Sequence, residues 1–223
     1  MSPTAETKRQ LILLRHGQTE YNATDRMQGQ LDTDLTELGR TQAKNAAAEL
    51  STRSPLRIVS SDLRRASDTA AALSDATGVP VLLDERLRET HLGQWQGLTH
   101  LDVDDLSPGA RLAWRADAEM APPDGESRLD VARRSVPVVS ELVAGVPEWG
   151  RHGAAEPVVV VAHGGLIAAL TAALLDLPVD RWPVLGGLSN TSWVQLSSHG
   201  DDSALGWRLD VWNASARVAS DVL

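Results

Sequence analysis

A run of four consecutive valines at residues 158–161 constrains the fold of this chain more than any other segment. β-Branched side chains favour strands, and a run without polar residues is typical of a strand that is buried on both faces. Such a strand needs an apolar layer on each side, and the helices of an α/β protein supply these layers. The run therefore indicates an α/β protein with this segment inside a parallel sheet.

The rest of the chain alternates short apolar segments, typical of strands, with longer segments of helical periodicity. The predicted strands are residues 10–14, 57–60, 81–83, 157–162, 192–196 and 207–212, the last two at a sheet edge. The predicted helices are residues 36–50, 63–77, 109–117, 128–143 and 165–175, and Pro137 predicts a kink or break in the fourth. This order predicts a three-layer α/β/α sandwich with a mostly parallel central sheet. The length suits one domain over residues 1–223, with a helical lid or insertion at about residues 99–145.

Composition and charge argue against several classes of function. The formal net charge of −9 at pH 7 disfavours a nucleic-acid partner, because such proteins usually carry a basic face. The absence of cysteine excludes disulfides and thiolate chemistry. Residues 1–10 lack the apolar core of a signal peptide, and no apolar run is long enough to span a bilayer. We therefore expect a cytoplasmic protein with a small-molecule substrate and with neither a nucleic-acid nor a membrane partner.

Residues that can bind a charged substrate follow four of the predicted strands. Arg15 and His16 come directly after the first strand, Arg65 follows the second, Glu89 lies beyond the third, and His163 follows the valine run. Open α/β sheets bind ligands outside the carboxyl ends of their strands. We therefore expect these side chains to meet at one end of the sheet.

Two arginines and two histidines around one point suit a phosphoryl group. The planar guanidinium matches phosphate oxygens, and fixed cations stabilise the charge that spreads over them during transfer. A neutral imidazole can attack phosphorus, and a carboxyl group such as that of Glu89 can protonate the leaving oxygen. His163 and Gly164 also precede a predicted helix, whose N-terminus favours an anion.

Each of these residues has a plain structural explanation when it is taken alone. The tripeptide Arg15-His16-Gly17 is a weak motif, His163 can start a helix, and Arg65 can pair with an aspartate on a helix surface. A metal site competes as an interpretation of two histidines, but neither lies in a ligand-spaced cluster, and nearby arginines repel cations. The combination, with each residue after a different strand, favours phosphoryl chemistry.

Four motifs resemble those of the histidine phosphatase superfamily, also called phosphoglycerate-mutase-like, and they occur in that family's order. They are Leu14-Arg15-His16-Gly17-Gln18-Thr19 followed by Asn22, Ser61-Asp62-Leu63-Arg64-Arg65-Ala66, Leu87-Arg88-Glu89 followed by Gly93, Trp95 and Gly97, and Val161-Ala162-His163-Gly164-Gly165. The resemblance spans most of the chain and implies a phosphoglycerate-mutase-like fold.

The resemblance implies a role for each matching residue. His16 matches the nucleophile that becomes phosphorylated, and Glu89 matches the proton donor. Arg15, Arg65 and His163 match the residues that bind phosphate. Further substrate contacts are expected from Asn22, Gln28, Gly164 and His91, and His91 is equally explained as a loop contact. The resemblance implies no metal and no cofactor.

Residues 99–126 indicate that water accepts the phosphoryl group. Mutases of the family hold a second phosphate with basic residues of a longer insertion, whereas this segment is acidic and its arginines are Arg111 and Arg115. A cofactor-dependent phosphoglycerate mutase is the second interpretation. A broad-specificity phosphatase and a protein that binds phosphate ligands without catalysis are further alternatives. Arg111, Trp114 and Arg115 are candidates for a lid over the site.

A narrower resemblance concerns the substrate. Residues 26–33, 89–93, 108–115 and 208–215 are similar to members of the family that act on a sugar-linked phosphoglycerate. This resemblance implies a small phosphorylated sugar acid as the substrate and a homodimer as the assembly. The late apolar strands offer an edge at which two chains can pair.

Overall fold

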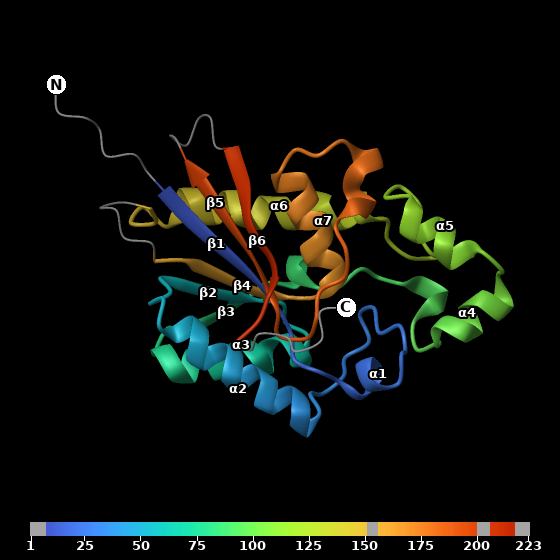
Figure 1. Ribbon diagram of the computed structural model, residues 1–223, viewed down its shortest axis with the longest axis horizontal. Coiled ribbons are helices and arrows are strands. Elements are labelled where there is room, and N and C mark those ends of the chain that lie inside the picture. The colour runs from blue at the N-terminus through green and yellow to red at the C-terminus, as the bar shows by residue number, and fades with distance from the viewer. Residues whose placement is uncertain (1–7, 151–155, 200–205, 217–223) are drawn as a thin grey trace.

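A six-stranded sheet with strand order β3-β2-β4-β1-β5-β6 lies at the centre of the computed structural model, which describes residues 8–150, 156–199 and 206–216 (Figure 1). The strands are β1 (Lys8–Arg15), β2 (Arg57–Ser60), β3 (Val81–Leu83), β4 (Val158–Ala162), β5 (Trp193–His199) and β6 (Gly206–Ala214). β3, β2, β4 and β1 pair in parallel, and β5 and β6 join by antiparallel pairing. The predicted mostly parallel sheet is confirmed, with β6 at an edge. The expectation about a signal peptide concerns residues 1–10, and residues 1–7 of these lie outside the described residues.

Two layers of helices cover the sheet, which confirms the predicted three-layer sandwich (Figure 1). Helices α2 (Glu37–Ser51) and α3 (Arg64–Thr77) pack on one face, against side chains such as Ile12 and Leu14 of β1. Helices α6 (Arg128–Gly145) and α7 (Gly164–Leu174) pack on the other face, against Leu11 and Leu13 of the same strand. Successive side chains of a strand point to opposite faces, so β1 contributes to both cores.

The valine run forms β4, which lies between β1 and β2. Val158 and Val160 belong to the core under α6 and α7, whereas Val159 and Val161 belong to the core under α2 and α3. All four are 0% exposed. Each buried valine stabilises the fold by roughly 1.5–3 kcal/mol, and burial on both faces explains why no polar residue interrupts the run.

Helix α6 continues through Pro137, so the predicted break at this proline is wrong. A proline inside a helix removes one backbone hydrogen bond and crowds the preceding turn, at a cost of about 3 kcal/mol. Pro137 is exposed, whereas Val131, Val138, Val139 and Val143 are buried against the sheet. The apolar contacts on both sides of Pro137 hold α6 in one piece and outweigh the local cost.

Short helices lie in several of the connections between the strands and the long helices. They are α1 (Glu20–Ala23), α4 (His100–Leu106), α5 (Ala110–Ala116) and the 3₁₀ helices Glu85–Leu87, Gly93–Trp95 and Val179–Val184. α5 was expected from the sequence, whereas α1 and α4 were not. Capping boxes of Thr19 with Asn22 and of Thr99 with Asp102 start these two helices, and that pattern is their sequence signal.

A small apolar cluster attaches α4 and α5 to the rest of the molecule. It contains Met27, Leu92, Trp95 and Val103, with Trp114 of α5 packed against it. In Figure 1 the two helices extend to one side of the sandwich, beyond α1. None of the helices in the described parts of the chain is both long enough and apolar enough to cross a membrane.

Candidate active site

The carboxyl ends of β1, β2 and β4 bring the two predicted histidines together. His16 follows β1 and His163 follows β4, and the two strands pair up to Arg15 and Ala162. The backbone N–H of His16 donates to the carbonyl of Ala162 at 3.0 Å. The imidazole ring centroids are 5.1 Å apart. The parallel register of neighbouring strands therefore places the two rings side by side, as expected.

His16 is buried, and one of its ring nitrogens is already occupied. Nδ1 lies 2.7 Å from the carbonyl oxygen of Gly17, so Nδ1 carries the proton and donates it there. The lone pair is then on Nε2. Burial, followed by the nearby guanidinium groups of Arg65 and Arg15, holds the pKa of His16 well below its ordinary 6.5. His16 is therefore a neutral imidazole at pH 7 with a free nucleophilic nitrogen.

Gly17 is required by the close approach of α2. A Cβ atom at this position would lie 2.4 Å from the carbonyl oxygen of Gly39, a distance that real side chains do not tolerate. The backbone N–H of Gly17 donates to the hydroxyl of Thr69 on α3 at 3.1 Å. The loop that carries His16 is thus held against both helices of one face.

At the carboxyl ends of these strands, three buried nitrogens from three different side chains have no hydrogen-bond partner among the described residues. They are Nε of Arg15, Nε of Arg65 and Nδ1 of His163. The other ends of the two arginines are anchored to backbone carbonyls. Arg65 donates to Leu31 and to Gly29, each at 2.7 Å, and Arg15 donates to Leu188.

Unpartnered buried donors are rare in proteins, because each one costs about 1–3 kcal/mol. Arg65, His16 and Arg15 all lower the pKa of His163, after the effect of its burial, which shows that these groups lie within electrostatic range of one another. Burial lowers the pKa of Arg65 to about 10, so that side chain stays charged at pH 7. The three nitrogens therefore form a site that a tetrahedral anion can satisfy.

Glu89 reaches the same site from the segment after β3. Its Oε1 accepts hydrogen bonds from the backbone N–H groups of Thr90 at 2.8 Å and Leu166 at 2.9 Å, and its Oε2 accepts one from Gly165 at 3.0 Å. Gly165 and Leu166 are in the first turn of α7, where backbone N–H groups favour a carboxylate. A Cβ on Gly165 would lie 2.6 Å from Oε1, so this close approach requires glycine.

Asn22 and Gln28 lie in a hydrogen-bonded network next to the His16 loop. Oδ1 of Asn22 accepts from the backbone N–H of Thr19 at 3.1 Å and caps α1. Oε1 of Gln28 accepts from the hydroxyls of Thr19 at 2.9 Å and Thr33 at 2.8 Å. The side-chain oxygens of both amides therefore hold the loops at the site in place by hydrogen bonds.

The remaining predicted contacts differ in how close they come to the anion site. A Cβ on Gly164 would lie 3.5 Å from Nε of Arg15, so Gly164 borders the site. Nδ1 of His91 lies 3.2 Å from the carbonyl oxygen of Asp124 and within 3.3 Å of the backbone nitrogen of Gly93. In this structure His91 makes loop contacts through that nitrogen.

The candidate lid residues on α5 are engaged with their neighbours. Arg111 forms an ion pair with Asp104 of α4 at 2.6 Å. The ring of Trp114 packs edge-on against Trp95, and the guanidinium of Arg128 lies over it at 5.8 Å. Arg115 is exposed. The charge of Arg111 is therefore compensated within the α4–α5 segment.

Three residues without an expected role also contact the site. The hydroxyl of Ser61 lies 2.9 Å from Nε2 of His163. Nδ2 of Asn190 donates at 3.2 Å both to the carbonyl of His16 and to Oδ1 of Asn22. Arg134 of α6 donates to the backbone carbonyls of Arg86 at 2.7 Å and Glu89 at 3.0 Å. Ser61 is within a motif that the sequence displays, whereas Asn190 and Arg134 reach the site through tertiary contacts that no local pattern marks.

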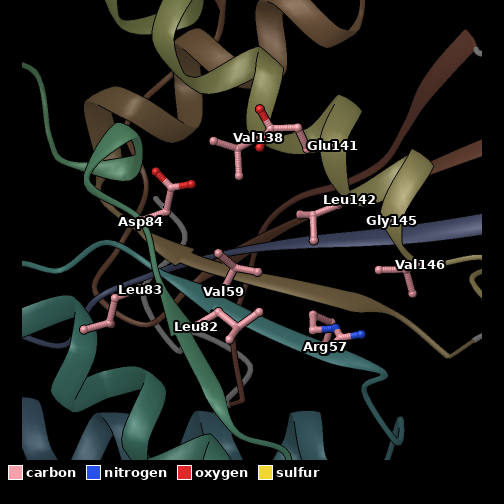
Figure 2. Close-up of a pocket in the computed structure, with 10 residues that line it drawn as sticks. All are labelled: Arg57, Val59, Leu82, Leu83, Asp84, Val138, Glu141, Leu142, Gly145 and Val146. Atoms are coloured by element: carbon pink, nitrogen blue, oxygen red, sulfur yellow. The ribbon is translucent and has the colours of Figure 1, made fainter.

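Other features of the described residues lie away from this chemistry. No group of three or more histidine, aspartate or glutamate side chains in these ranges is arranged to hold a metal ion. A hollow of about 430 Å³ between β2, β3 and α6 is lined by residues such as Arg57, Leu82 and Glu141, and Figure 2 shows strand side chains on one side and helix side chains on the other. None of the predicted site residues lines this hollow.

The fold and this site define an α/β protein in which two arginines and two histidines of lowered pKa surround one point, an arrangement that can bind an anion. Residues 11–215 match the family model of the histidine phosphatase superfamily (branch 1). The chain therefore belongs to the histidine phosphatase superfamily, and the resemblance of its four motifs is confirmed.

Its relatives within the family are similar over nearly their whole length. The chain is 68% identical over 222 residues to the glucosyl-3-phosphoglycerate phosphatase of Mycolicibacterium vanbaalenii, covering 96% of this chain and 99% of that protein. It is 66% identical, with the same coverage, to the protein of that name from Mycobacterium tuberculosis. The solved structure of a mycobacterial glucosyl-3-phosphoglycerate phosphatase in complex with VO3 superimposes with a TM-score of 0.91 at 66% identity, covering 93% of this chain and 100% of that one.

Proposed function

We propose that this protein is a phosphatase that hydrolyses glucosyl-3-phosphoglycerate to glucosylglycerate and phosphate through a phosphohistidine on His16. The free Nε2 of the neutral His16, which lies beside three unpartnered buried donors, is the observation that carries the proposal. The name and the 66–68% identity of the relatives support the substrate. We propose that the product then enters the synthesis of methylglucose polysaccharides.

In the first step, Nε2 of His16 attacks phosphorus while the bond from phosphorus to the alcohol oxygen of the substrate breaks. Arg15, Arg65 and His163 donate hydrogen bonds to the phosphoryl oxygens and stabilise the charge that spreads over them. Glu89, in its protonated form, gives its proton to the leaving oxygen. The products of this step are glucosylglycerate and phosphohistidine.

In the second step, water attacks the phosphohistidine. Glu89, now a carboxylate, takes a proton from the water, and the P–N bond breaks so that its electron pair returns to Nε2 of His16. Water rather than a second phosphorylated molecule is the acceptor, because Arg111 is compensated by Asp104 and the segment at residues 99–126 is acidic. The mutase interpretation needs a second phosphate site, which this charge pattern disfavours.

We propose that Asn22, Gln28 and Gly164 line the substrate site and that His91 releases its loop contacts to reach the substrate. The chain is, on this proposal, one domain, with an insertion at about residues 99–145 whose last helix, α6, packs on the sheet. α4 and α5 would form the part of it that covers the glucosyl moiety. Their attachment through Leu92 and Trp95, close in sequence to Glu89, supports this arrangement.

We further propose that the protein is a homodimer and acts in the cytoplasm. β3 is an edge strand, and its residues Leu82 and Leu83 are 48% and 58% exposed beside the hollow of Figure 2. Pairing this edge with a second copy would cover the unpaired strand and its leucines. The cytoplasmic location is supported by the chemistry of the proposed substrate, because a charged phosphate ester crosses an apolar bilayer only at great cost.

Phosphate release from glucosyl-3-phosphoglycerate and from 3-phosphoglycerate, by wild type and His16→Ala, tests the function. We expect the glucosylated substrate to have the higher kcat/KM and the variant to lose at least about 1,000-fold in kcat. Labelled substrate should transfer its phosphoryl group to His16 in wild type and in the control His100→Ala. A normal rate in His16→Ala would disprove the covalent step. Isomerisation of 3-phosphoglycerate that outpaces phosphate release, when 2,3-bisphosphoglycerate is added, would support a mutase instead.

A further inference from the structure

His163 has two different environments at its two ring nitrogens. Nε2 lies 2.9 Å from the hydroxyl oxygen of Ser61. Nδ1 is buried and has no hydrogen-bond partner among the described residues. Both His163 and Ser61 are 0% exposed. A neutral imidazole carries one proton, so the contact at Nε2 decides whether Nδ1 can donate a hydrogen bond to a ligand.

The hydrogen bonds around Ser61 indicate which partner supplies the proton. The hydroxyl oxygen of Ser61 accepts a hydrogen bond from the backbone N–H of Leu63 at 3.3 Å. The backbone groups of Ser61 are also satisfied, since its N–H donates to Val161 at 3.0 Å and its carbonyl accepts from the hydroxyl of Ser60 at 2.8 Å. The hydroxyl proton of Ser61 still needs an acceptor, and Nε2 of His163 is the acceptor recorded for it in the described ranges.

If Nε2 of His163 carried the proton instead, two groups would lose their partners. The hydroxyl proton of Ser61 would have no acceptor, and Nδ1 would present a lone pair to a site whose other unpartnered buried atoms are Nε of Arg15 and Nε of Arg65. A lone pair repels a phosphoryl oxygen, whereas an N–H stabilises it. Burial and the nearby guanidinium of Arg65 also disfavour the doubly protonated ring, because they hold the pKa of His163 well below 6.5.

We propose that Ser61 is a positioning residue, whose hydroxyl donates a hydrogen bond to Nε2 of His163. This bond keeps the proton of the neutral ring on Nδ1, and the Nδ1–H group donates a hydrogen bond to the phosphoryl group. Ser61 acts through His163 and does not itself touch the substrate. The inference rests on the proposed role of His163 as a phosphate donor. Ser60 provides a matched comparison, because its hydroxyl is equally buried but donates to the backbone carbonyl of Ser61 at 2.8 Å rather than to the ring of His163.

The tautomer is measured on the wild-type protein without ligand, by ¹⁵N NMR of the imidazole, with His163→Ala used to assign the signals. We expect a pyrrole-like shift for Nδ1 and a pyridine-like shift for Nε2 of His163. Ser61→Ala should move the ring towards the other tautomer or a mixture, and Ser60→Ala should leave it unchanged. A protonated Nε2 of His163 in the wild type would overturn the inference.

The kinetic test compares Ser61→Ala and Ser60→Ala in kcat/KM and in inhibition by inorganic phosphate. We expect Ser61→Ala to lose about 10–100-fold in kcat/KM and to bind phosphate more weakly, by analogy with the loss of the hydrogen-bond partner that orients a metal-bound histidine. Ser61→Thr, which restores a hydroxyl, should recover part of the loss if its thermal midpoint matches wild type. Equal losses in Ser60→Ala and Ser61→Ala would overturn the inference in favour of a packing effect. Wild-type phosphate affinity in His163→Ala would instead refute the proposed role of His163.

Discussion

At the scale of single residues, this site depends on which nitrogen of each histidine carries the proton. His16 donates from Nδ1 to the carbonyl of Gly17, which leaves Nε2 as a nucleophile. His163 contacts the hydroxyl of Ser61 through Nε2, which leaves Nδ1 facing the anion site. Two histidines can therefore have opposite roles, one as a nucleophile and one as a hydrogen-bond donor, because one ring is bonded to a carbonyl acceptor and the other to a hydroxyl donor.

The lowered pKa values of both histidines predict their behaviour on acidification. As the pH falls past 6.5, exposed or unfolded histidines take up protons, but His16 and His163 should stay neutral until a much lower pH. An NMR titration of the two rings should thus show no midpoint near 6.5. A midpoint near that value for either ring would contradict the prediction.

The same pKa shifts predict how stability depends on pH. For both histidines the folded-state pKa lies below the unfolded-state value. Their contribution to the free energy of unfolding is therefore fully present above about pH 6.5 and is lost as the pH falls through the folded-state pKa. The measurement is the free energy of unfolding as a function of pH. His16→Ala and His163→Ala should each lose less stability than wild type over the acid range. Parallel curves for wild type and both variants would refute this linkage.

At the scale of elements, α6 positions the segment that carries Glu89. Arg134 of α6 donates to the carbonyls of Arg86 and Glu89 and pairs with Glu126 at 2.9 Å. Glu126 in turn accepts from the backbone N–H of His91 at 2.8 Å. Most of the side chain of Arg134 is buried, so these bonds are shielded from competing water. A helix that packs on the sheet through its valines therefore also holds the acid/base segment.

Arg134→Met should lower kcat by roughly tenfold and the free energy of unfolding by about 1–3 kcal/mol, because Glu126 and two carbonyls lose their donor. Arg133→Met is the control, since Arg133 is exposed and its pair with Asp130 is worth at most about 0.5 kcal/mol. Steady-state kinetics and denaturant unfolding measure both quantities. A variant that loses stability while it keeps the wild-type kcat would show that Arg134 supports the fold but not Glu89.

At the scale of the whole molecule, the sheet has an exposed edge on the side of β3. β3 contains three residues, and Leu82 and Leu83 remain exposed beside α6. Exposed strand edges with apolar side chains tend to pair with another chain. The proposed homodimer would use this edge, and the predicted site residues do not line the adjacent hollow.

Light scattering of wild type, Leu83→Glu and Leu106→Glu tests this assembly. We expect a dimer for wild type and for the control Leu106→Glu, because Leu106 is an exposed leucine of α4 away from β3. Leu83→Glu should be a monomer, since a charge buried at the interface without a partner is costly. A monomeric wild type, or a Leu83→Glu variant that remains a dimer, would contradict the proposed interface.

The sequence by itself determined the layered fold and the residues that meet at the carboxyl ends of the strands. A valine run without polar interruptions predicts a strand buried on both faces, and the parallel pairing of β1 with β4 then brings His16 next to His163. Local patterns carry this information because strand and helix periodicities reflect burial. The break predicted as one alternative at Pro137 is wrong, because the local rule for proline ignores the valines that hold α6 on the sheet.

The tertiary structure alone decided how these residues are prepared for chemistry. The proton position on His163 depends on Ser61, which is 102 residues away along the chain. The Glu89 segment depends on Arg134, and the His16 loop depends on Asn190. Hydrogen bonds and ion pairs between distant segments leave no periodic trace in a sequence, because each is set by the packing of whole elements rather than by neighbouring residues.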